Sequence, residues 1–270
     1  MRNFTVLIPI HVWGEDEKQY IEKAISSVDE CQTNYTNGTI NCLVVCASSV
    51  YDEITKYFND TKFKVEVNTL KNEGKTDYCS QINFGAQNVK TDYFSILEFD
   101  DVYLPKWFKQ VDEYFYGNED VSVMLPINLV HDVDGTKWQY CNEMVLASSF
   151  STELGFIDFG CLENCTVFNL TGGVFNTQDF INVGMYKPSI DVAFNYELLL
   201  RMTSKELKVY VVPKEGYNHV LNRPGSLIER YNKEIEPEDI NKYFELAKRE
   251  YTYTEDRNKT IIKQKDVDLK

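Results

Sequence analysis

Short apolar runs alternate with amphipathic segments along the first half of the chain. β-Branched and apolar stretches bounded by turn residues predict four buried strands, at residues 5–10, 41–46, 63–67 and 93–97. The segments that follow these strands place apolar residues at helical spacing, which predicts helices at residues 15–28, 50–58, 75–88 and 106–116. Such alternation is typical of an α/β fold with a mostly parallel, Rossmann-like central sheet that is flanked by helices on both faces.

The second half of the chain is less regular. We predict strands at residues 121–129 and 209–212, helices at residues 177–183 and 191–203, and a last helix around residues 237–251. No linker or internal repeat separates the halves, so we expect both to contribute to one sheet. On this pattern the chain divides into residues 1–110, residues 111–225 and a helical tail at residues 226–270.

Ligands in open α/β sheets bind beyond the carboxyl ends of the strands. The turns that follow the four predicted strands should therefore face one crevice. This places four polar side chains on the same side of the molecule: His11, Ser48, Asn72 and Asp100.

An acidic turn, with Glu98, Asp100 and Asp101, ends the fourth predicted strand. Carboxylates packed together raise one another's pKa, and a divalent cation relieves that repulsion. Mn²⁺ or Mg²⁺ prefers oxygen ligands and leaves positions for phosphate oxygens. A solvated loop explains the turn equally well on its own, because the chain has 42 Asp and Glu residues.

Charge and composition exclude some classes of binding partner and indicate a compartment. A net charge of −14 disfavours nucleic acid and anionic lipid surfaces as partners. No apolar run reaches the roughly 18 residues of a membrane span, and no secretory signal precedes the first strand. With seven cysteines, an odd number, we expect a reduced, cytoplasmic protein.

Five segments together resemble the family-2 glycosyltransferases of the GT-A fold. Their order and spacing match the family pattern over roughly the first 110 residues, and the matching segments are Val6-Leu7-Ile8-Pro9, Asn72-Glu73-Gly74, Asn83-Phe84-Gly85, Leu97-Glu98-Phe99-Asp100-Asp101 and Leu104-Pro105. The resemblance continues more weakly through Gly172-Gly173 and the segment that begins at Asn195. It implies a GT-A fold in which residues 1–110 bind a nucleotide-sugar and residues 111–225 form an acceptor-side extension.

The resemblance implies an inverting transfer from a nucleoside-diphosphate sugar to a hydroxyl of a glycan or glycoconjugate. We favour a UDP-sugar donor, with a GDP-sugar as the other possibility. Mn²⁺ or Mg²⁺ would be held by Asp100 and Asp101, with Glu98 in place of the first Asp of the family's DXD-like motif. The residues implied in donor binding are Pro9, His11, Ser48, Asn72, Lys75, Asp77, Glu98, Asp100, His219 and Arg223.

The acceptor side is implied by fewer residues. Gly172 and Gly173 look like the family's acceptor segment, and Trp138 lies in a polar stretch where its ring could stack on a sugar. The catalytic position departs from the family pattern, because Phe194-Asn195 replaces the usual Glu-Asp pair and Asn195 cannot act as a general base. Asp191 lies four residues earlier, on the same face if the helix includes it, and is our candidate base. An N-cap role for Asp191 carries equal weight.

Two alternatives remain at this point. Asn195 supports a non-catalytic nucleotide- or sugar-binding module with the same fold. A sugar-phosphate nucleotidyltransferase shares the architecture, but it would usually carry a glycine-rich, basic loop after the first strand. His11-Val12-Trp13-Gly14 has a single glycine and neither Lys nor Arg, which argues against that activity.

Overall fold

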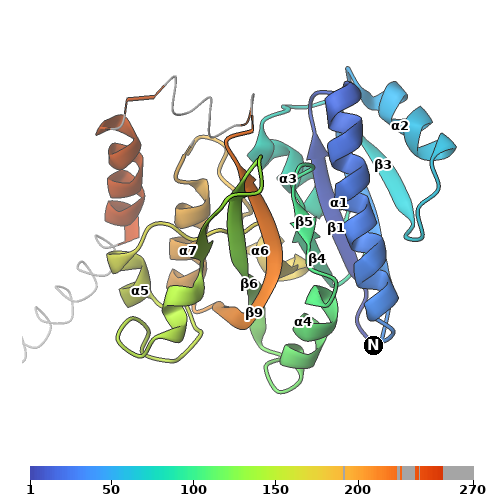
Figure 1. Ribbon diagram of the computed structural model, residues 1–270. Helices are drawn as coiled ribbons and strands as arrows, with labels where there is room; N and C mark the ends of the chain where they lie inside the picture. Colours follow the sequence, from blue (N-terminus) through green and yellow to red (C-terminus); the bar gives the residue numbers. More distant parts are fainter. Residues whose placement is uncertain (191, 224–225, 227–234, 237, 252–270) are drawn as a thin grey trace, which may run out of the picture.

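The computed structural model describes residues 1–190, 192–223, 226, 235–236 and 238–251. Within these residues, nine strands form one sheet in the order β3-β2-β1-β4-β8-β6-β9-β5, and β7 pairs with β6. Helices cover both faces of this sheet (Figure 1). The predicted α/β class is confirmed, and both halves of the chain contribute to the sheet.

The first half builds the parallel part of the sheet. Its strands are β1 (Phe4–Ile10), β2 (Ile40–Ala47), β3 (Val67–Asn72) and β4 (Tyr93–Ile96). β1 pairs in parallel with both β2 and β4, and β2 pairs in parallel with β3. All seven residues of β1 are buried, which is expected for a central strand covered on both faces.

Four helices follow these strands. α1 (Glu15–Asn34), α2 (Tyr51–Asp60) and α4 (Trp107–Phe115) pack on one face of the sheet, and α3 (Tyr78–Asn88) packs on the other. Alternate residues of β1 divide between the two faces, since Val6 and Ile8 join the cluster with α1 whereas Leu7 joins the cluster with α3.

The third strand was predicted too early in the chain. The alternating residues 63–67 pack Phe63 and Val65 against the core, but the ladder with β2 begins only at Val67. β3 lies at the edge of the sheet, so most of its side chains are only partly buried and the apolar pattern there is weak.

The second half adds mixed pairing. Its strands are β5 (Val102–Tyr103), β6 (Val121–Asp132), β7 (Lys137–Cys141), β8 (Val174–Asn176) and β9 (Lys208–Leu221). β8 is antiparallel to β4 and β6, β5 is antiparallel to β9, and β6 runs parallel to β9. The sheet is thus parallel through β4 and mixed beyond it. β6 and β9 are longer than predicted because polar residues such as His131 and His219 continue their ladders.

The remaining helices gather beside the second half of the sheet. They are the short 3₁₀ turn Glu143–Leu146, α5 (Phe159–Asn164), α6 (Thr177–Asn182) and α7 (Phe194–Ser204). α7 begins three residues later than predicted, and Asp191 lies outside the described residues.

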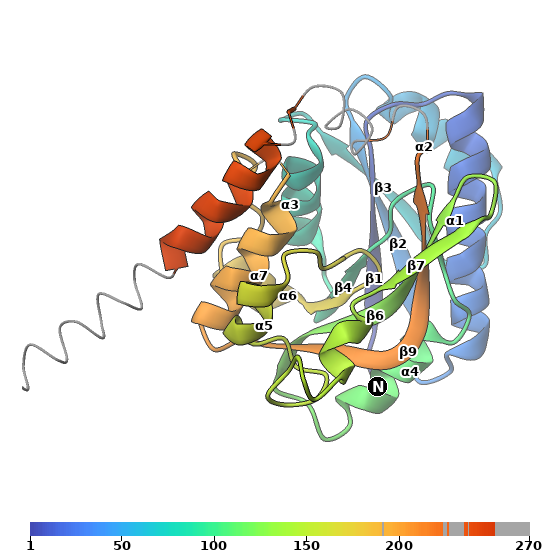
Figure 2. The same cartoon turned by 60° about the vertical axis from the view of Figure 1, so that its left-hand side comes forward.

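A last helix, at residues 238–251, agrees with the predicted tail helix and lies alongside α7 (Figure 2). The contact is apolar and aromatic, because Ala247 is buried and the rings of Phe244 and Tyr196 lie 5.6 Å apart. Among the helices that the structure describes, none combines the length and apolar character needed to cross a membrane.

Candidate functional site

A cavity of about 340 Å³ opens at the carboxyl end of the sheet. Four parts of the chain form it: the end of β1, the start of α3, the acidic turn after β4, and the end of β9 with the residues that follow. The lining residues are Pro9, His11, Thr76, Asp77, Tyr78, Gln81, Glu98, Phe99, Asp100, His219, Val220, Leu221, Asn222, Arg223 and Ser226. Its position is the one that the strand order of an open α/β sheet favours.

Asp101 is the most deeply held residue of the acidic turn. It is 1% exposed, and its Oδ2 atom lies 2.9 Å from Nδ1 of His219. The backbone N–H of Val220 donates a 2.8 Å hydrogen bond to its Oδ1 atom. The two contacts span sequence separations of 118 and 119 positions. They form because β5 pairs with β9 directly beside the turn.

Asp100 pairs with a different cation. Nε of Arg223 donates to its Oδ2 atom at 2.5 Å, and the guanidinium lies 4.8 Å from the ring centroid of Phe99. That distance is typical of a cation–π contact. Burial and the neighbouring Asp101 carboxylate raise the pKa of Asp100, although Arg223 acts against the shift.

Burial and mutual repulsion disfavour the ionised forms of the carboxylates in the acidic turn. Burial and the Asp101 carboxylate raise the pKa of Glu98 to about 8. Burial opposes the charged form of His219, but the carboxylates of Asp101, Glu98 and Asp100 together raise its pKa to about 9. Added positive charge in this place would stabilise the ionised carboxylates.

The geometry of the turn fits a divalent cation. Glu98, Asp101 and His219 each offer a ligand atom, and these atoms lie within 4.8 Å of one another. Two carboxylates and one imidazole suit first-row divalent metals such as Mn²⁺. The sequence assigned a metal to Asp100 and Asp101. The structure brings Asp101 together with Glu98 and His219, and Asp100 forms an ion pair with Arg223.

Seven of the ten predicted donor-binding residues line the cavity: Pro9, His11, Asp77, Glu98, Asp100, His219 and Arg223. Asp77 also caps α3 by accepting a 2.9 Å hydrogen bond from the backbone N–H of Ser80. The others, Ser48, Asn72 and Lys75, do not belong to the lining.

Ser48 and Asn72 shape the loop before α3. The Asn72 side chain accepts a hydrogen bond from the backbone N–H of Gly74 and donates one to the carbonyl of Lys75. The hydroxyl of Ser48 donates to the carbonyl of Asn72 at 2.9 Å, which ties the loop to the end of β2. Lys75 is exposed on this loop.

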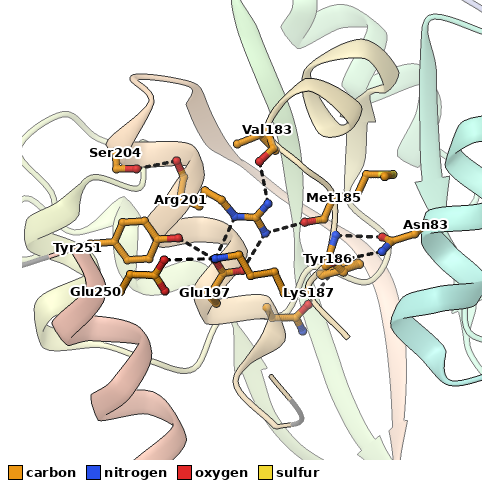
Figure 3. Close-up of polar contacts among 11 residues, drawn as sticks. Asn83, Val183, Met185, Tyr186, Lys187, Glu197, Arg201, Ser204, Glu250 and Tyr251 are labelled. Carbon is orange, nitrogen blue, oxygen red and sulfur yellow. Dashed lines mark hydrogen bonds and ion pairs between the residues drawn. The ribbon is translucent and has the colours of Figure 1, made fainter. Parts of the chain in front are cut away.

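Asn195 lies at the start of α7, and its side chain is hydrogen-bonded by Tyr186, a residue that precedes this helix. The Tyr186 hydroxyl donates a 3.0 Å hydrogen bond to its Oδ1 atom. The amide of Asn83 binds both the backbone N–H and the carbonyl of Tyr186, at 2.9 and 2.8 Å (Figure 3). The ring of Tyr78, which lines the cavity, lies 6.4 Å from the ring of Tyr186. Asn195 is therefore connected to the cavity through two tyrosines.

The three predicted acceptor residues lie outside the cavity lining. Gly172 adopts a φ of +76°, and a Cβ atom there would approach a ring atom of Tyr217 to 2.5 Å. A Cβ atom on Gly173 would lie 2.7 Å from Leu125. Both glycines therefore permit close packing, while the Trp138 side chain is 59% exposed on β7.

Several lining residues were not identified from the sequence. Thr76 lies just before α3, and Tyr78 and Gln81 lie in its first turns. All three closely follow the Asn72-Glu73-Gly74 segment, and their nearness to that motif was the available signal. Val220, Leu221 and Asn222 lie between His219 and Arg223, and their position between these two predicted donor residues was the available signal.

Solved structures with this fold include four of S. aureus TarS. Residues 1–349 of TarS in complex with UDP-GlcNAc align with a TM-score of 0.64 at 14% identity, over 91% of this chain and 65% of that one. The complex of the same TarS fragment with UDP gives a TM-score of 0.56 at 13% identity, over 90% and 69% of the two chains. A longer TarS structure gives a TM-score of 0.54 at 14% identity. The alignment covers 89% of this chain and 42% of the longer TarS chain.

No curated protein matches the sequence. The family model described as glycosyl transferase family 2 matches residues 5–170, which include β1 to β4, the acidic turn and β6. The matched region is more than half of the chain and contains most of the residues that line the cavity. The chain therefore belongs to glycosyl transferase family 2.

Proposed function

We propose that this protein transfers a sugar from a UDP-sugar to a hydroxyl group of a glycan or glycoconjugate, with inversion at the anomeric carbon and with the help of Mn²⁺ or Mg²⁺. The observation that carries the proposal is the cavity at the carboxyl end of the sheet, where Glu98, Asp101 and His219 converge. The UDP and UDP-GlcNAc complexes of TarS, which has the same fold, favour a uridine nucleotide as the donor.

Glu98, Asp101 and His219 would hold the cation. A divalent ion bound there supplies positive charge that stabilises a departing diphosphate. Arg223 brings a cationic side chain to a protein with a net charge of −14, and binding of an anionic donor requires such local positive charge. Pro9 and the ring of Tyr78 offer the less polar surface that a nucleoside needs.

The general base is proposed to be Asp191. We expect Asp191→Asn to lower turnover by about 10²–10⁴-fold, the usual contribution of a general base, while UDP binding is unchanged. Turnover is measured as UDP release in the presence of a hydroxyl acceptor, and binding by calorimetry. Asp60→Asn, the same change at the exposed end of α2, serves as the control and should match the wild type. Undiminished turnover in Asp191→Asn would remove this residue as the base.

A non-catalytic binding module is the second candidate. The observation that favours it is the amide of Asn195, which stands at the family's base position and is held by the Tyr186 hydroxyl. UDP-sugar that binds to the protein but is neither transferred nor hydrolysed, with either metal, would support this alternative. Family membership argues against the sugar-phosphate nucleotidyltransferase.

A further inference from the structure

Gln81 presents an unpartnered acceptor at the cavity. It lies in the first turns of α3, has 0% exposure and belongs to the cavity lining. Its Nε2 atom donates a 3.0 Å hydrogen bond to the carbonyl of Thr76. Its Oε1 atom has no hydrogen-bond partner within the described part of the chain.

The orientation of the amide follows from that single contact. A carbonyl oxygen accepts hydrogen bonds only, so the nitrogen of Gln81 must face Thr76 and the oxygen must face away. Buried acceptors in native proteins nearly always have a partner, since leaving one unpaired is costly. Among the described residues, three other buried side chains have an unpartnered oxygen, and none of them lines the cavity: Gln110, Asn128 and Asn218.

The charged residues of the lining indicate which part of a nucleotide-sugar would contact Gln81. Arg223 is the only Lys or Arg among the described lining residues, and it follows the end of β9, close to the proposed metal ligands, so a diphosphate is stabilised there. The α3 segment contributes no Lys or Arg to the lining, and its Asp77 would repel phosphate. The nucleoside is therefore the part that suits the wall formed by Pro9, Tyr78 and Gln81.

Resting on the proposed function, we infer that Gln81 is a specificity-determining residue whose Oε1 atom accepts a hydrogen bond from the nucleoside of the donor. Uridine offers two kinds of donor group, the imide N3–H of uracil and the ribose hydroxyls. A site with a buried acceptor discriminates against a ligand that lacks the matching donor group, because the acceptor then stays unpaired. No bond is made or broken at Gln81.

The test compares UDP with 3-methyl-UDP, 2′-deoxy-UDP and 3′-deoxy-UDP by calorimetry with Mn²⁺ present. The wild type should bind UDP about tenfold more tightly than the analogue that lacks the group facing Gln81. Gln81→Met has a side chain of similar length without the acceptor, and it should bind UDP and that analogue equally. Gln81→Glu, which keeps an acceptor oxygen, should still discriminate.

The comparison separates a direct contact from a disturbed fold. A structural defect in Gln81→Met would weaken all four ligands alike and leave the discrimination of the wild type in place, which would overturn the inference. Equal binding of all four ligands by the wild type would overturn it as well. If the wild type binds no UDP, the proposed function fails and takes this inference with it. If it binds UDP but the variant discriminates as before, only the inference fails.

Discussion

Asp101→Asn should abolish turnover of the UDP-sugar while leaving the protein folded. Asp101 is one of the three side chains that converge in the acidic turn, and both of its oxygens are engaged, by His219 and by the backbone of Val220. Asparagine has nearly the same size but carries no charge, so it is a poorer metal ligand than aspartate. Its NH₂ group would replace one of the two acceptor oxygens, and the contact with either the Val220 N–H or the His219 imidazole would be weakened. UDP release by the variant should not exceed the uncatalysed background.

The matched control for this variant is Asp112→Asn. Asp112, on α4, is also buried, at 3% exposure, but it pairs with Arg2 and does not line the cavity. Asp112→Asn should keep the turnover of the wild type per folded molecule, as determined from UDP release and from circular dichroism of the same samples. Turnover of folded Asp101→Asn within tenfold of the wild type would contradict the role assigned to the acidic turn.

Glu197→Leu should lower the free energy of unfolding by about 3–5 kcal/mol, the usual result of removing one partner from a buried ion pair. Glu197 has 0% exposure and accepts hydrogen bonds from Arg201 at 3.0 and 2.8 Å and from Tyr251 at 2.7 Å. Lys187 lies 2.8 Å away (Figure 3). Burial alone would raise the pKa of Glu197, but these partners lower it. Leucine would leave the buried Arg201 guanidinium without its carboxylate.

Urea denaturation measures this change, and the double variant Glu197→Leu/Arg201→Met tests its cause. Replacing both charges by apolar groups removes the isolated cation, so the double variant should regain part of the loss. Recovery should be incomplete because Arg201 also binds the carbonyls of Val183 and Met185. A single variant within about 1 kcal/mol of the wild type would show that the network contributes little.

This network also bears on the site. The Val183 and Met185 carbonyls that Arg201 holds lie in the loop that carries Tyr186, whose hydroxyl binds Asn195. Tyr251 belongs to the tail helix, so the tail is connected to the start of α7 by buried polar contacts. Loss of Glu197 is therefore expected to loosen the surroundings of Asn195 as well.

Much of the fold could be predicted from the sequence because a parallel strand covered on both faces is apolar along its length. β1 is the clearest case, and the acidic turn was recognisable because charged residues directly follow the buried β4. The edge strand β3 was misplaced because partial exposure weakens its pattern. β9 was predicted too short because its second part carries polar residues such as Glu215 and Asn218.

The details of the site depended on contacts that local patterns do not contain. The contact between Asp101 and His219 spans 118 positions and requires the pairing of β5 with β9. Gln81 is buried in α3, but in the sequence it is one of several polar residues of that helix and nothing distinguishes it as buried. Predicting the first would have required the strand register, and predicting the second would have required the packing of α3 on the sheet.

The central claim, that the cavity binds a UDP-sugar together with a divalent cation, is tested most directly by thermal unfolding. The wild type and Asp101→Asn should be melted with UDP-sugars, with and without Mn²⁺. A ligand that binds only the folded state stabilises it by about 2.7 kcal/mol at a hundred times its Kd. We predict a rise in Tm that needs both Mn²⁺ and a UDP-sugar and is lost in Asp101→Asn, which removes one of the proposed metal ligands. An unchanged Tm with every UDP-sugar, or an equal rise in Asp101→Asn, would contradict the claim.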